Sequence, residues 1–123
     1  MNIHLFKVVV EFKVLLLQKL SYSEMSNMNF DEYKVFVFYF FREVDSLRRN
    51  GLLKEHIYSF VNEYYGEVIS NVDEDDIMFQ RRFEVFIEEL MEFCSFPFFW
   101  ETEIEIYLKK WERVFESNWF KEL

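Results

Sequence analysis

The fold of this chain is decided by residues 28–51, which read MNFDEYKVFVFYFFREVDSLRRNG. Asn29 can cap the start of a helix, and Glu32, three residues later, can reach back to the Asn29 amide and complete a capping box. At the other end, Gly51 suits the left-handed residue that follows a helix C-terminus. These signals predict one helix over residues 29–50, roughly 30 Å long.

The middle of this stretch leaves two structures open. Residues 35–41, VFVFYFF, are consecutive apolar residues rich in strand formers, and alone they could form a buried strand. We favour a helix because the capping signals frame one continuous element in which apolar residues recur at helical spacing. An element that is apolar on nearly every side is expected to be buried on nearly every side. We therefore expect the other helices to pack around this one.

Four further segments carry apolar residues at helical spacing and predict helices over residues 3–20, 52–69, 73–95 and 98–119. The first contains the β-branched run Val8–Val10, which leaves a strand possible there. Residues 21–27 are polar and are expected to form a connector. The sequence thus predicts an all-α bundle of about five helices.

The fourth predicted helix has the clearest start in the chain. Asp73 is expected to be its N-cap, with the next three residues, all acidic, in the first turn, where the helix dipole favours anions. Its apolar stripe is expected to run as far as Phe93. The helix is expected to stop near residue 95, because Pro97 disfavours a helical conformation at the residue before it.

Composition supports a single helical domain spanning residues 1–123. Hydrophobic residues make up 51% of the chain, too many for a disordered protein. There are 17 Phe, 7 Tyr and 3 Trp, so large side chains must do most of the packing. Two Gly and one Pro supply too little turn chemistry for a sandwich or barrel.

The residues that could carry chemistry are few. Cys94 is the single cysteine, so a structural zinc site of clustered thiolates is excluded, and it is expected to behave as a small buried hydrophobe. His4 and His56 are the two histidines, and neither lies in a metal-binding motif. The nucleophile elbow and the glycine-rich phosphate loops are also missing. We expect no enzymatic activity, no cofactor and no metal.

The N-terminal segment shows no secretory signal, since Lys7, Glu11 and Lys13 interrupt it. The chain has no uncharged apolar run of the ~18 residues that a membrane span requires. A cytoplasmic protein without a membrane contact is therefore expected.

Acidic charge gathers in the second half of the chain. The net charge is −9, and residues 72–123 hold 14 acidic and 6 basic residues, a balance of −8. Glu84, Glu88 and Glu92 recur every four residues and form one stripe along the fourth predicted helix. Direct nucleic-acid binding is disfavoured, because phosphate contacts need accumulated positive charge. A basic protein is the expected partner.

Candidate contacts for that partner combine carboxylates with aromatic rings, which are common at interface cores. Five aromatic residues lie off the strongest apolar stripes and are predicted to be exposed: Tyr58, Tyr65, Phe99, Tyr107 and Phe120. The predicted contact residues are Asp73, Glu74, Asp75, Asp76, Glu84, Glu88, Glu89, Glu92, Glu101, Glu103, Tyr65 and Phe99.

With these features the chain resembles, as a class, the small acidic immunity proteins that bacteria make against their own toxins, including colicin-type and contact-dependent-inhibition nucleases. The resemblance rests on small size, acidity, aromatic richness and the run Asp73–Asp76 with the glutamate stripe. It implies tight one-to-one binding that covers or distorts the active site of a basic toxin.

Two alternative functions remain open at this point. The chain could be a phage-encoded antagonist that imitates the charge of nucleic acid, such as an anti-restriction or anti-CRISPR protein. Such proteins also bind a basic partner through an acidic surface. A structural protein could instead bury its exposed aromatic residues in a homo-oligomer.

Overall fold

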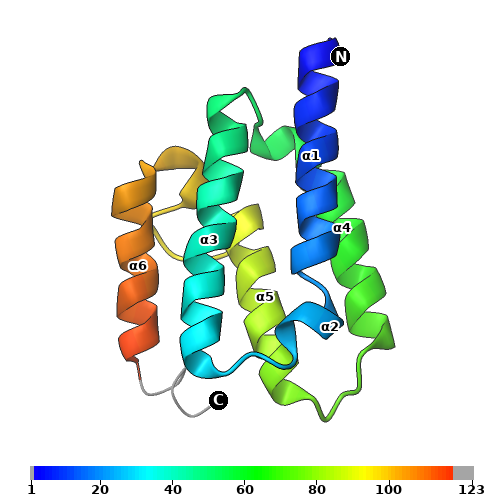
Figure 1. Cartoon of the computed structure of the whole chain (residues 1–123), viewed down its shortest axis with the longest axis vertical. Coiled ribbons are helices and arrows are strands. Elements are labelled where there is room, and N and C mark those ends of the chain that lie inside the picture. The colour runs from blue at the N-terminus through cyan, green and yellow to red at the C-terminus, as the bar shows by residue number, and fades with distance from the viewer. Residues whose placement is uncertain (1, 118–123) are drawn as a thin grey trace.

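Six α-helices and one short 3-10 helix make up residues 2–117, the part of the chain that this computed structural model describes (Figure 1). They are α1 (Ile3–Lys19), α2 (Tyr22–Met25), α3 (Phe30–Arg49), α4 (Lys54–Asn71), α5 (Ile77–Met91), η1 (Phe99–Glu101) and α6 (Ile104–Glu116). No strand occurs among these residues, so the alternatives at 8–10 and 35–41 both resolve to helix and the all-α prediction is confirmed. The predicted end of the last helix at residue 119 and the ring of Phe120 lie outside the described residues.

The ends of α3 follow from its own sequence. Asn29 accepts a hydrogen bond from the Glu32 amide (2.8 Å), and the Glu32 carboxylate accepts one from the Asn29 amide (3.0 Å), so the predicted capping box is confirmed. Gly51 has a φ of 106°, and the Leu52 amide donates back to the Leu47 carbonyl (3.1 Å). This left-handed ending is the one that a glycine favours.

The helices form two layers. Figure 1 shows α6, α3 and α1 side by side in one layer, with α5 and α4 behind them. The middle position of α3 in its layer leaves its outer face uncovered: Val35 is 70% exposed and Tyr39 is 46% exposed. The expectation that this helix is buried on nearly every side is therefore wrong, because only its inner and lateral faces meet other helices.

Helix α5 begins three residues later than its acidic start predicts. Asp76 is the N-cap and accepts from the Phe79 amide (3.2 Å). Asp73, predicted to be the cap, instead forms a turn in which its carboxylate accepts from the Asp75 amide (2.9 Å). Any aspartate in this run could cap a helix locally. Asp76 differs in that its second carboxylate oxygen accepts from the Tyr22 hydroxyl (2.6 Å), a contact with α2.

Helix α5 also ends earlier than Pro97 predicts. Glu92 adopts a left-handed conformation (φ 60°), and the Phe93 amide turns back to the Glu88 carbonyl (2.9 Å). Phe93, predicted to lie on the apolar stripe, is consequently 63% exposed. The chain then runs through a loop to η1, which replaces the first residues of the predicted final helix.

Two other segments differ from the prediction, and α4 ends at Asn71 rather than at residue 69. Helix α4 starts at Lys54 rather than at residue 52, because His56 Nδ1 accepts from the Leu53 amide (3.0 Å) at the start of the helix. The predicted polar connector contains the single-turn helix α2, whose N-terminus is capped by Ser21.

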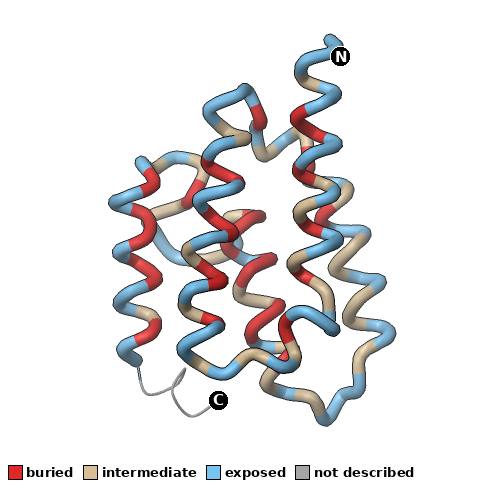
Figure 2. The backbone as a smooth tube through the Cα atoms, in the orientation of Figure 1, coloured by how far each residue is buried: buried red, intermediate tan, exposed pale blue. Residues whose placement is uncertain are grey.

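Aromatic side chains make up much of the core between the two layers. Figure 2 shows buried segments recurring along α3, α5 and α6. Phe86 of α5 lies at the centre of this packing, with its ring 5.1–6.1 Å from five other aromatic rings: Tyr33, Phe36, Phe40, Phe41 and Trp111. Phe99 and Tyr107 belong to the same core, so their predicted exposure is wrong.

Candidate partner-binding surface

The structure divides the predicted acidic contacts into residues that are engaged within the chain and residues that are not. Glu89 is buried, its carboxylate lies 2.9 Å from Lys110 Nζ of α6, and it accepts a hydrogen bond from the Tyr107 hydroxyl (2.6 Å). A carboxylate in this position cannot meet a partner. The prediction that Glu89 is a contact residue is wrong.

Lys110 also forms hydrogen bonds with the loop that follows α5. Its ammonium group donates to the carbonyls of Ser95 (2.5 Å) and Pro97 (3.3 Å) and to the thiol of Cys94 (3.4 Å). Burial first, and then the hydrogen bond and charge of Glu89, raise the pKa of the Cys94 thiol to about 12. Since the thiolate is the reactive form, Cys94 is a poor nucleophile at neutral pH.

Glu92, the last residue of the predicted stripe, is paired as well. Its carboxylate lies 3.0 Å from Lys54 Nζ at the start of α4. The pair links the two ends of the antiparallel α4 and α5 helices. Glu92 therefore contributes little net charge to the surface.

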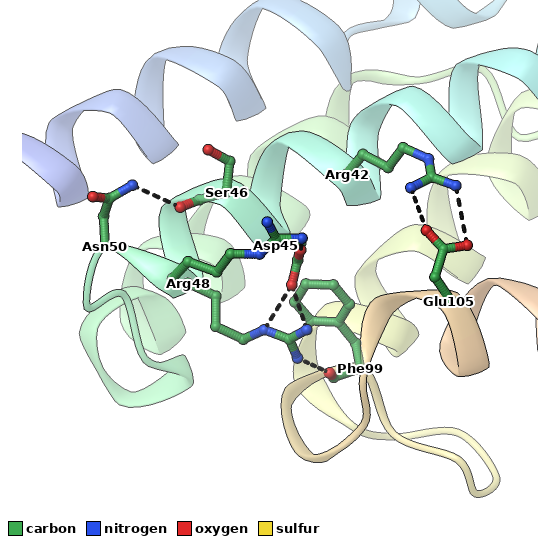
Figure 3. A network of polar contacts seen from close by, with 8 residues as sticks. Arg42, Asp45, Ser46, Arg48, Asn50, Phe99 and Glu105 are labelled. Carbon is green, nitrogen blue, oxygen red and sulfur yellow. Dashed lines mark hydrogen bonds and ion pairs between the residues drawn. The ribbon is translucent and has the colours of Figure 1, made fainter.

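A second internal cluster joins α3 to η1 (Figure 3). Asp45 is buried and pairs with both Arg48 and Arg49. Arg48 also donates to the Phe99 carbonyl, and its guanidinium lies 4.5 Å from the centre of the Phe99 ring. Phe99 is thus enclosed by this cluster, and its prediction as a partner contact is wrong.

The negative charge of the glutamates at the end of η1 and just after it is partly balanced by nearby arginines. Arg42 makes two hydrogen bonds to Glu105 (2.8 and 3.4 Å), which with its charge hold the pKa of Glu105 below its ordinary value. Glu101 and Glu103 are exposed, but Glu103 shares a groove with Arg48 and Arg49. Positive groups therefore lie beside this part of the predicted surface.

Among the described residues, two carboxylates of α5 form no salt bridge, although Glu88 lines a groove with Lys110 and Arg113 of α6. Glu88 is exposed and Glu84 is partly exposed, and within residues 2–117 neither forms a salt bridge with a lysine or arginine. Partial burial, and then the charges of Glu84 and Glu89, raise the pKa of Glu88. Tyr65 of α4 donates to Glu84 (3.4 Å), so an aromatic ring adjoins the carboxylates.

Three further carboxylates, Asp73, Glu74 and Asp75, are exposed in the turn that leads into α5. Asp76 is partly buried and is occupied by its capping bond and by Tyr22. Within the described chain, the unpaired carboxylates of α5 and of the turn before it, called here the α5 acidic face, are Asp73, Glu74, Asp75, Glu84 and Glu88, with the ring of Tyr65 beside them.

The raised pKa of Glu88 leads to a stability prediction. A folded-state pKa above the unfolded value of about 4.3 means that the contribution of Glu88 to stability is full below that value and is lost as pH rises through the folded pKa. Glu88→Gln is therefore expected to raise the free energy of unfolding at pH 7 by a few tenths of a kcal/mol, because it removes a partly desolvated charge and its repulsion with Glu84, a like-charge pair four residues apart. Urea denaturation at pH 7 and pH 4 measures the change, which should disappear at the lower pH.

The matched control is Glu92→Gln, one helical turn further on. It removes the ion pair with Lys54 and is expected to lower stability at pH 7. A stability loss in Glu88→Gln as large as that in Glu92→Gln would show that the α5 acidic face carries no repulsion.

No group of three or more histidine, cysteine or acidic side chains among residues 2–117 is arranged to hold a metal ion. Within the same residues, no helix has the length and apolar content needed to cross a membrane.

Comparisons of the chain with protein-family models, with curated proteins and with solved structures found no match.

Proposed function

We propose that this chain is a binding protein that neutralises a basic protein partner through the α5 acidic face. The observation that carries the proposal is the pair Glu84 and Glu88: like-charged carboxylates one turn apart, Glu88 exposed and Glu84 partly exposed, which form no salt bridge within residues 2–117. A lysine or arginine from a partner would remove this repulsion. The same contact would bring Tyr65 into the interface, where tyrosine is favoured.

The rest of the molecule supports this role through rigidity and charge. Helices α4 and α5 pack against each other, and the Lys54–Glu92 pair ties their ends, so the acidic face is held in one shape before binding. The net charge of −9 adds a long-range attraction for a basic surface. The specific form that we propose is a cytoplasmic bacterial immunity protein that binds a toxin domain, most simply a nuclease, whose substrate-binding surface is basic.

The first experiment is co-purification of the chain from its native host at low and high salt. A basic protein bound one-to-one, with nuclease activity that falls when the chain is added, is the expected result. Recovery of the chain with only acidic or neutral partners would contradict the proposal.

Charge reversal then tests the surface. Glu84→Lys with Glu88→Lys is expected to slow association with the purified partner by about tenfold at low salt, because complementary charge acts mainly on the on-rate. The matched control reverses Glu112 and Glu116, another exposed glutamate pair four residues apart, on α6. Stopped-flow or surface-plasmon measurements give the rates. Equal slowing in both variants would assign the effect to net charge rather than to the α5 acidic face.

A further inference from the structure

Helix α1 carries a second apolar stripe on the side that faces away from the core. Figure 2 shows buried and exposed segments alternating along α1 after its N-terminal turns, with the first buried residue at Val8. The side chains that α1 contributes to the core are Val8, Val9, Phe12 and Leu16. The other stripe, called here the outer α1 stripe, consists of residues that are between 40% and 89% exposed: Ile3, Phe6, Val10, Val14 and Leu17. At about 100° per residue the two stripes are centred roughly 150° apart on the helix.

The spacing of the outer α1 stripe is symmetric. Its members are separated by 3, 4, 4 and 3 residues, so Val10 lies at the midpoint. In an antiparallel pair of such helices with a twofold axis at Val10, Ile3 lies opposite Leu17. Phe6 then lies opposite Val14, which sets a large side chain against a small one. A surface that is its own complement after a twofold rotation is the requirement for a symmetric homodimer.

We propose that two copies of this chain associate through antiparallel packing of the outer α1 stripe. The inference is independent of the proposed function, because the α5 acidic face lies on other helices.

The area of the stripe is enough for a small dimer interface only. It runs about 21 Å along the helix. The exposed fractions correspond to roughly 500 Å² of surface per copy, near the upper end of the apolar patches found on monomers. A standard interface buries about 800 Å² per partner. Tyr39 of α3 is also exposed and shares a groove with Val14, but polar side chains line the same groove and Lys19 lies over the Tyr39 ring.

Charges lie along one edge of the stripe, where Lys7 and Glu11 are both exposed. In the antiparallel arrangement each Lys7 lies within about one helical turn of Glu11 of the second copy, and the two Glu11 residues lie equally close to each other. The apolar stripe, rather than these edge charges, carries the pairing. A lipid surface is the alternative occupant, since residues 3–19 carry three lysines against one glutamate, and vesicle binding separates it from a second copy.

Sedimentation equilibrium of the whole chain at micromolar concentration tests the proposal. The expected mass is twice the 15.4 kDa of the chain. Val10→Glu sets two carboxylates against each other at the axis and is expected to raise the dissociation constant at least about 100-fold. Ile106→Glu, which changes an exposed apolar residue on α6, is the control and should remain dimeric. Circular dichroism verifies that both variants are folded.

Disulfide cross-linking tests the direction of the helices. Val10→Cys is expected to cross-link to itself, and an equal mixture of Ile3→Cys and Leu17→Cys is expected to give mixed disulfide dimers. Self-linked Ile3→Cys dimers would indicate parallel helices and overturn the proposal, as would a monomer at every concentration. A monomer that binds anionic phospholipid vesicles through Val10 would overturn it too, by assigning the stripe to a lipid surface.

Discussion

Lys110→Met is expected to lower the free energy of unfolding by about 3–5 kcal/mol, because it leaves the carboxylate of Glu89 buried without its cation. The side chains of Lys110 and Glu89 are only 11% and 6% exposed. The substitution also releases the Ser95 and Pro97 carbonyls that the ammonium group holds. Guanidinium denaturation followed by far-UV circular dichroism measures the loss.

Two comparisons make this expectation specific. Arg42→Met breaks the pair with Glu105, whose side chains are 53% and 61% exposed, and should cost less than about 1 kcal/mol. The double variant Glu89→Gln with Lys110→Met leaves no unpaired charge at this site and should recover about 1–3 kcal/mol of the loss. Equal effects of Lys110→Met and Arg42→Met would show that the Glu89–Lys110 pair is not buried as described.

Phe86→Ala is expected to lower the free energy of unfolding by about 3–5 kcal/mol, since it opens a cavity where α3, α5 and α6 meet. The Phe86 ring is stacked on Phe41 at 5.5 Å and lies 5.8 Å from Trp111. Phe86→Leu refills most of the volume and should cost less. Thermal and urea denaturation of the two variants measure the difference.

The control for this core substitution is Phe93→Ala. It removes an equal side chain from the exposed loop after α5 and should change stability by no more than about 0.5 kcal/mol. A loss below about 1 kcal/mol in Phe86→Ala would contradict the central position of this ring in the aromatic core.

Much of the fold could be predicted because its signals are local. The capping box of Asn29 and Glu32 joins atoms three residues apart, and Gly51 ends α3 through its own backbone freedom. The run Asp73–Asp76 was less decisive, since each of its aspartates can cap a helix and the choice of Asp76 depends on Tyr22, 54 residues away. Glu92 ends α5 in a conformation that favours glycine, and no local pattern indicates this.

The candidate site was predicted less well than the fold. Helical spacing places Glu84, Glu88 and Glu92 on one stripe, but it does not say which of them has a cation nearby. Glu92 pairs with Lys54, which is 38 positions away in the sequence. The buried Glu89 pairs with Lys110, which is 21 positions away. The outer α1 stripe could have been found from its spacing alone, yet both apolar sides of α1 satisfy the same helical pattern.

By itself, then, the sequence determined that the chain is helical, where the central helix begins and ends, and that it carries an excess of acidic residues. These properties depend on atoms within about one helical turn of each other or on composition alone. Only the tertiary structure decided which carboxylates are neutralised, which aromatic rings are buried and which side of α1 faces the core. Each of these depends on residues that are distant in sequence and meet only when the helices pack.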